Sequence, residues 1–147
     1  MLFQTAAIWL AMAFLSTGNP RELNKPDHIA VLVGSAFLRA VGEKDIETAL
    51  PLCAQKVSFN GKIIEGRKKV ALRLKKMLER VPPETRFRKV IGLSSEEMYE
   101  KFGPPPKRIS TLTLKKAVFV LGRLYKGGLI VILDKVDGRY KIIGLTV

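Results

Sequence analysis

The chain has 147 residues, which is enough for one domain with a sizeable core but not for two. Hydrophobic residues make up 47% of it and charged residues 27%, a globular composition that excludes an intrinsically disordered chain. The formal net charge is +13 and is unevenly placed: residues 1–60 hold five basic and five acidic side chains, whereas residues 61–90 hold eleven and three. Such an excess indicates either anionic partners or a solvated basic face.

The N-terminal segment carries no charge. Residues 1–18 contain no charged side chain, and residues 2–15 are almost continuously apolar. A bilayer-spanning helix needs about twenty apolar residues, so this shorter run is more typical of a signal peptide, with Ser16-Thr17-Gly18 as small residues for cleavage. No Lys or Arg precedes it, which leaves an uncleaved anchor as an alternative. We expect a signal peptide or anchor over 1–18, a linker over 19–27 and an exported (periplasmic or secreted) domain over 28–147.

Two helices are predicted at the start of this domain. Asp27 stands where an N-cap belongs, and apolar residues then recur every three or four positions over residues 28–41. A shorter helix is expected over Ile46–Ala54, with Asp45 as its cap. The single cysteine, Cys53, falls on this second helix and is expected to be a small buried hydrophobe without a disulfide partner.

A hairpin and a strongly basic helix are predicted next. Val57–Phe59 and Lys62–Ile64 flank Asn60-Gly61, a pair that adopts positive φ readily and signals a two-residue turn. Residues 67–81 then combine an apolar stripe with Lys and Arg elsewhere. The candidate anion-binding side chains of this third helix are Arg67, Lys68, Lys69, Arg73, Lys75 and Lys76.

The rest of the chain is expected to be mainly strands. A strand over Arg86–Leu93 is followed by a short helix that Ser94 and Glu97 open with capping-box spacing. Further strands are expected over Thr111–Tyr125, Leu129–Val136 and Tyr140–Val147, with turns at Gly127-Gly128 and Asp137-Gly138. Residues 118–121 and 129–133 are apolar on both alternating faces. They therefore belong to the sheet interior, covered on one side by helices and on the other by a partner or a lid.

The order of these elements predicts an α+β fold, a cone-shaped curved antiparallel sheet wrapped on three N-terminal helices. Residues 36–40, Lys44-Asp45, Leu50, residues 57–61 and Gly66 carry a resemblance to the nuclear-transport-factor-2-like superfamily, also called SnoaL-like or cystatin-like. The match covers about residues 28–147, with residues 94–108 as an insertion. The resemblance implies an apolar pocket at the open end of the cone and a homodimer through the open sheet face. The pocket candidates are Phe37, Phe59, Met77, Phe119, Tyr125 and Tyr140.

Several chemistries lack the residues they need. Enzymes of the family that the chain resembles carry a carboxylate base on the hairpin strand, where this chain has Val57–Asn60, or rely on Asp–His pairs, for which only His28 is present. One His and one Cys make a transition-metal site of ordinary ligand count unexpected. The sequence has no nucleotide-binding glycine motif and no nucleophile elbow. We therefore predict no catalytic residue, no cofactor and no metal.

Three functions remain as hypotheses. The first is a non-enzymatic exported domain that binds a small apolar ligand or a protein partner. The second is a basic module that binds an acidic polymer or a membrane surface through the third helix and residues 107–126; the lack of interleaved aromatic residues argues against sequence-specific nucleic acid. The third is an isomerase- or dehydratase-type enzyme with an atypical base, which would need Glu65, Asp134 or Glu84 inside the pocket.

Overall fold

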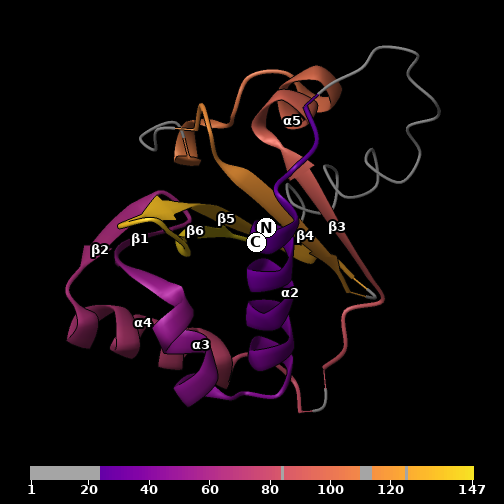
Figure 1. Ribbon diagram of the computed structural model, residues 1–147. Coiled ribbons are helices and arrows are strands. Elements are labelled where there is room, and N and C mark those ends of the chain that lie inside the picture. Colours follow the sequence, from indigo (N-terminus) through magenta and orange to yellow (C-terminus); the bar gives the residue numbers. More distant parts are fainter. Residues whose placement is uncertain (1–23, 84, 110–113, 125) are drawn as a thin grey trace.

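The computed structural model describes residues 24–83, 85–109, 114–124 and 126–147, which form helices packed on a six-stranded sheet (Figure 1). The predicted signal peptide or anchor and most of the predicted linker lie outside these residues. Within the described part, no helix has both the length and the apolar character needed to span a membrane.

Three helices, α2 (His28–Gly42), α3 (Ile46–Leu52) and α4 (Arg67–Glu79), precede most of the sheet in the sequence. Both predicted N-caps are confirmed: the Asp27 carboxylate accepts from the N–H of Ile29 at 2.9 Å, and that of Asp45 accepts from the N–H of Thr48 at 3.2 Å. The second helix ends at Leu52, so the prediction that Cys53 is helical is wrong. Cys53 already has extended backbone and begins the first strand.

The sheet has the strand order β2-β1-β6-β5-β4-β3. Its strands are β1 (Cys53–Phe59), β2 (Lys62–Glu65), β3 (Lys89–Ser94), β4 (Val118–Arg123), β5 (Gly128–Val136) and β6 (Arg139–Thr146). The predicted turns at Asn60-Gly61 and Asp137-Gly138 are confirmed, because all four residues have positive φ, as a two-residue hairpin turn of this type requires. β4 is shorter than predicted: residues 114–117 are not strand, and residues 110–113 and Tyr125 lie outside the described residues.

The α+β class with a curved sheet is confirmed, and one pairing adds a feature that the sequence did not predict. β1 runs parallel to β6, with Ser58 opposite Gly144 and Phe59 opposite Leu145, whereas the other neighbouring strands are antiparallel. The sheet is therefore mixed. β6 joins the β1–β2 hairpin to the β3–β4–β5 meander.

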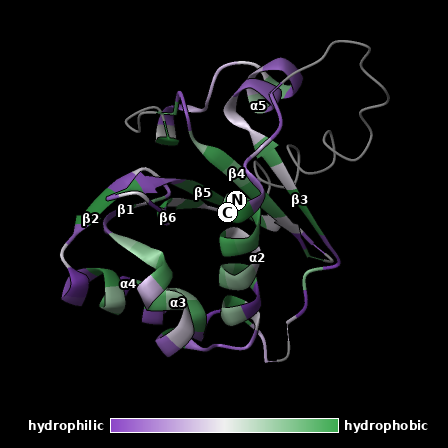
Figure 2. Cartoon of the chain, viewed as in Figure 1, coloured by the Kyte–Doolittle hydropathy of each residue, from purple (hydrophilic) through white to green (hydrophobic). Residues whose placement is uncertain are grey.

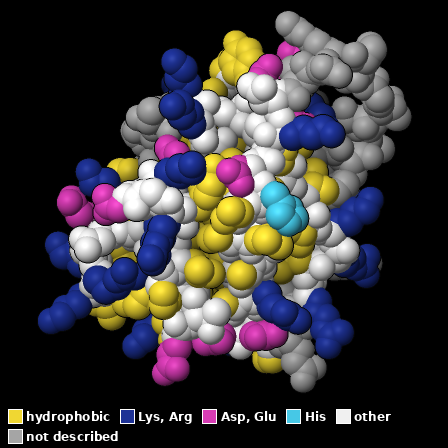
Figure 3. Space-filling model, in the orientation of Figure 1, with side chains coloured by type: hydrophobic (Ala, Val, Ile, Leu, Met, Phe, Trp, Pro, Cys, Tyr) yellow, Lys and Arg dark blue, Asp and Glu magenta, His cyan; other side chains and the backbone are white. Residues whose placement is uncertain are grey.

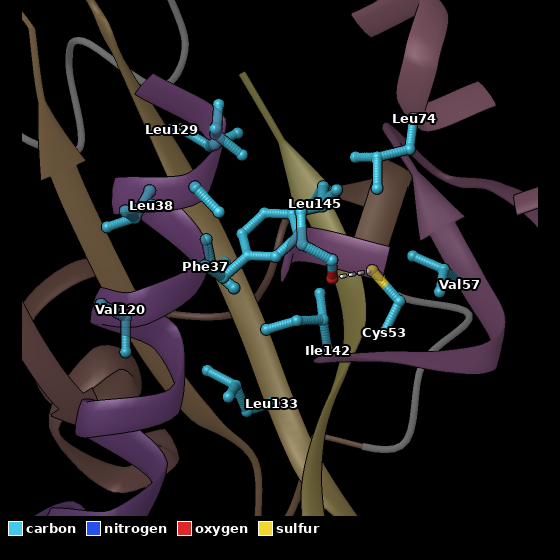
Figure 4. Packing of buried hydrophobic residues seen from close by; sticks show 14 of the residues in the cluster. Phe37, Leu38, Cys53, Val57, Leu74, Val120, Leu129, Leu133, Ile142 and Leu145 are labelled. Carbon is cyan, nitrogen blue, oxygen red and sulfur yellow. Dashed lines mark hydrogen bonds between the residues drawn. The ribbon is translucent and has the colours of Figure 1, made fainter. Parts of the chain in front are cut away.

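The main core lies between this sheet and the three helices (Figure 4). Phe37 of α2 is fully buried among side chains that include Leu133 and Ile142. Glycine allows α2 to approach the sheet closely: a Cβ built on Gly34 would lie 2.5 Å from Val120 Cγ2, and one on Gly122 of β4 would lie 2.9 Å from Leu38 Cδ1 of α2. Any larger residue at these positions would push the layers apart.

The opposite face of the sheet has its own cover. The outward-facing Phe119, Leu121, Ile130 and Ile132 are buried against α5 (Ser95–Phe102) and the segment around η1 (Lys107–Ile109). The capping box of α5 is confirmed, since Ser94 and Glu97 exchange side-chain-to-backbone hydrogen bonds of 3.0 and 3.1 Å. The sequence predicted that either a partner or a lid covers this second face of the strands. In the structure, α5 and the residues around η1 form that lid. The homodimer stays a prediction.

Candidate ligand-binding site

A cavity of about 330 Å³ opens between α4 and the end of the sheet where β1 and β6 finish. Its floor and far wall come from the end of α2, the β1–β2 turn, Leu124, Gly128 and Leu129. The described residues that follow α4, 81–83 and 85–87, close one side. This segment lies directly against α2, because a Cβ added to Gly42 would collide with the carbonyl oxygen of Thr85. The lining residues are Val41, Phe59, Asn60, Arg73, Lys76, Met77, Arg80, Val81, Pro82, Thr85, Phe87, Leu124, Gly128, Leu129, Leu145, Thr146 and Val147.

The inner part of the cavity is apolar. Phe59, Leu129 and Leu145 are buried and belong to the main core, so the cavity is a direct extension of that core. Met77 comes from α4, where its unbranched thioether can change shape around a bound molecule. A cavity of this size and lining lies within the roughly 300–1,000 Å³ of ordinary small-molecule pockets.

The mouth of the cavity is cationic. Arg73, Lys76 and Arg80 are exposed and line it from one flank of α4 and its C-cap. Their spacing of three and four residues places them on one side of the helix. Lys and Arg side chains gather over α4 at the lower left of Figure 3. The described residues that line the cavity include no Asp or Glu, so no acidic side chain among them neutralises these charges.

Two other polar side chains of the wall already bond to the chain itself. The Asn60 Oδ1 accepts from the N–H of Val147 at 3.0 Å, and the Thr85 hydroxyl donates to the carbonyl of Pro82 at 2.6 Å. These bonds fix the turn and the closing segment. The cationic groups are thus the more available polar partners for a ligand.

The six predicted pocket residues do not lie together. Phe59 and Met77 line the cavity. Phe37 is fully buried in the core instead, and Phe119 points to the other face of the sheet, where it lines a smaller hollow of about 190 Å³ with Met98 and Tyr99. Tyr125 lies outside the described residues.

Tyr140, the sixth candidate, has a different role. Its hydroxyl donates to the Asp27 carboxylate at 3.2 Å, and Asp27 is the N-cap of α2, so the pair connects β6 to the start of that helix. Partial burial, together with the neighbouring carboxylate of Asp27, raises the pKa of Tyr140. Tyr140 is not among the residues that line the cavity.

The six predicted anion-binding residues also separate. Arg73 and Lys76 stand at the cavity mouth, whereas Arg67 donates to the carbonyl of Leu50 at 2.8 Å and so closes the end of α3. Lys68, Lys69 and Lys75 are exposed and do not line the cavity. Arg80 was not among the predicted anion-binding residues. Its position could have indicated it, because Arg73, Lys76 and Arg80 are spaced i, i+3, i+7 and so share one side of a helix.

Of the three carboxylates that the isomerase or dehydratase hypothesis requires, the two in the described part of the chain do not line the cavity. Glu65 is exposed at the end of β2, and Asp134 of β5 accepts from the N–H of Lys135 at 2.8 Å. Glu84 lies outside the described residues. Among the described residues, no three His, Cys, Asp or Glu side chains come together in a way that could hold a metal ion.

Cys53 is buried, as predicted, and its thiol donates to the carbonyl of Ala49 at 3.7 Å (Figure 4). Burial raises the pKa of the Cys53 thiol to about 12, although the nearby cations Arg67 and Lys141 lower it in part. The group is therefore a neutral packing residue at ordinary pH and not a nucleophile.

No protein-family model matches the chain, and no curated protein matches its sequence. Similar solved structures include a protein of unknown function with a cystatin-like fold from Nostoc punctiforme, at 10% identity over 83% of this chain and 92% of that one, with a TM-score of 0.48. A protein from Sphaerobacter thermophilus is 15% identical over 82% and 94%, with a TM-score of 0.48. An NTF-2-like protein of unknown function from Shewanella oneidensis is 16% identical over 78% and 92%, with a TM-score of 0.41. The solved structures similar to this chain thus include representatives of the fold family that its sequence resembles.

Proposed function

We propose that the protein is a non-enzymatic binding protein whose ligand is a small, largely apolar molecule held in the cavity beside α4. The observation that carries this proposal is the cavity itself, about 330 Å³ in volume and continuous with the core through Phe59, Leu129 and Leu145. Apolar surface that is left open to water costs free energy, which a bound apolar molecule would recover.

Binding is favoured over catalysis by what stands around the cavity. The described lining residues offer no Asp, Glu, His or Cys side chain as a general base or nucleophile. The Oδ1 atom of Asn60 and the hydroxyl of Thr85 each form a hydrogen bond within the wall. A bound molecule would therefore meet groups that hold it but none that would transfer its protons.

The test is the binding of a neutral apolar fluorophore, N-phenyl-1-naphthylamine, to the full chain. We expect its emission to rise on binding and to saturate at one site. Val81→Phe would place a ring in the cavity, since Val81 lines it, and should abolish the signal. The matched control is Leu72→Phe on the same part of the chain, because Leu72 is 62% exposed and does not line the cavity. A signal that both variants keep would contradict the proposal.

We propose further that this binding protein acts outside the cytoplasm. The support is the uncharged, almost continuously apolar run of residues 2–15. Fractionation of the cells that express the full chain tests this: the protein should be found in the membrane or exported fraction, and its recovery with the cytoplasmic proteins would contradict the export.

A further inference from the structure

If the proposed function holds, the charge at the cavity mouth indicates the chemical class of the ligand's polar end, which the apolar wall alone does not. Arg73, Lys76 and Arg80 stand along one flank of α4 at the mouth. None of the three forms an ion pair or a side-chain hydrogen bond with another described residue that would compensate its charge. Three uncompensated cations this close repel one another, and an anion placed between them would relieve the repulsion.

The arrangement of these cations differs from that of the other cations nearby. Arg67 and Lys141 are engaged at the end of α3, where they donate to the carbonyls of Leu50 and Pro51 at 2.8 Å each. Lys68 and Lys75 fall on the opposite flank of α4 from Arg73 and Arg80, because the helix turns by about 100° per residue. Lys69 lies on the same flank as Arg73, one turn earlier, but it does not line the cavity. The mouth cations are thus distinguished from Lys68 and Lys75 by their flank of α4, and from Lys69 by their place at the cavity.

The cavity behind them takes the other end of the molecule. Its inner wall is formed by Phe59, Leu129 and Leu145, and the partly buried Met77 of α4 lines it as well. The Asn60 Oδ1 and the Thr85 hydroxyl already bond to the chain, and Thr146 is the only other uncharged polar side chain among the described lining residues, so a second polar group deep in the cavity would lose its hydration for few possible partners. The deep part therefore favours hydrocarbon.

We propose that the ligand is an anionic amphiphile, with a hydrocarbon tail in the cavity and a carboxylate or phosphate head between Arg73, Lys76 and Arg80. Arginine binds either head through paired N–H groups, and lysine adds a point charge. An acidic polymer could touch the mouth but has no tail to fill the cavity. A membrane surface would likewise meet the exposed cations without entering it.

The experiment is calorimetric titration of the full chain with four ten-carbon molecules below their micelle concentrations: decanoate, decyl phosphate, 1-decanol and decyltrimethylammonium. We expect the two anions to bind about tenfold or more tightly than the alcohol, since a charge-assisted hydrogen bond gives about this factor, and the cation to bind weakest. The ratio of decanoate to decyl phosphate affinity identifies the head. Octanoate and nonanoate should bind progressively more weakly, by about fourfold for each CH₂ removed from the cavity.

Variants separate the head from the tail. Arg73→Met and Arg80→Met keep an apolar stem, lose the charge and should reduce decanoate affinity about tenfold while leaving 1-decanol unchanged. Lys75→Met is the matched control on the other flank of α4 and should leave both affinities unchanged. Val81→Phe should weaken every ligand in the set.

Each outcome has a distinct meaning. If 1-decanol binds as tightly as decanoate, the cavity binds apolar molecules as proposed and the anionic head is refuted. If the affinity for the anions does not depend on their tail length, or if the Val81→Phe variant retains that affinity, the anions bind to surface charge alone. Either result overturns the inference. If none of the four binds, the proposed function fails with it.

Discussion

Helices α2 and α4 lie on the same side of the sheet, but they meet it in different ways (Figure 1). α2 packs closely across the central strands, where Gly34 and Gly122 remove the side chains that would hold the layers apart. α4 contacts the β1–β2 hairpin at the margin and presents Arg73, Met77 and Arg80 toward the space beside it. Figure 2 shows the corresponding difference in character, since α2 is largely apolar and α4 carries polar residues along much of its length.

The difference shows how one fold can hold a rigid half and an open half. Close packing around Phe37 supplies stability, because each buried apolar group adds to the core and few gaps are left. The open half beside α4 gives up some of that packing and gains a cavity. Substitutions should therefore act very differently on the two helices.

The largest expected effect is on the closed side. Phe37→Ala should lower the free energy of unfolding by about 3–5 kcal/mol, because it removes a fully buried ring and leaves a void. Urea denaturation of the full chain, followed by far-UV circular dichroism, measures the change. The control is Leu32→Ala on the same helix, where the side chain is 55% exposed and the cost should stay within about 0.5 kcal/mol. Equal losses would show that α2 does not pack as described.

The second prediction concerns the contact of α2 with β4. Gly34→Ala places a methyl group against Val120, at an overpacking cost of about 1–3 kcal/mol. The better helix propensity of alanine offsets about 1 kcal/mol of this. Repeating the substitution in a Val120→Ala background should make it neutral or stabilising. A double-mutant cycle with no coupling between the two positions would refute the close approach.

The third prediction tests how the start of α2 is held. Asp27→Ala removes the N-cap and the acceptor for Tyr140, and should cost about 1 kcal/mol. Tyr140→Phe removes only the second bond and should cost about 0.5 kcal/mol, since the pair is exposed. Asp27→Asn, which can still cap the helix, is the matched control. Thermal denaturation of the full chain distinguishes these variants, and a larger loss for Tyr140→Phe than for Asp27→Ala would reverse the assignment.

The smallest effect is expected on the open side. Val81→Leu adds one carbon next to the cavity and should change the free energy of unfolding by no more than about 0.5 kcal/mol, because the added group has room. The same urea titration measures it. A loss of stability as large as that of Gly34→Ala would mean that the space beside α4 is filled. The proposed difference in packing between α2 and α4 would then be refuted.

Much of the fold was predictable because its signals are local. The Asp27 and Asp45 caps, the two tight turns and the Ser94–Glu97 capping box each depend on residues within four positions of one another. The end of α3 was not predictable in this way. Pro51 is tolerated within the helix, and Cys53 becomes extended because it pairs with Ile142, a residue distant in the sequence.

The site was only partly predictable, for the same reason. Phe37 and Phe59 are both aromatic residues on apolar faces, and nothing local distinguishes a core ring from a cavity ring. The direction of Phe119 depends on which face of β4 receives α2, which is a property of the assembled layers. Likewise, Arg67 and Arg73 lie on the same basic helix, and the carbonyl of Leu50 that engages Arg67 comes from a neighbouring helix.

The position of β6 has a consequence for how the protein is made. This strand lies between β1 and β5, so the hairpin and the meander stay two separate half-sheets until residues 139–146 have been synthesised. During that interval the edges of β1 and β5 are open to pairing with other chains. Leu145 and Thr146 also line the cavity. The step that closes the sheet therefore completes the binding site as well, and a ligand would recognise only chains that have finished folding.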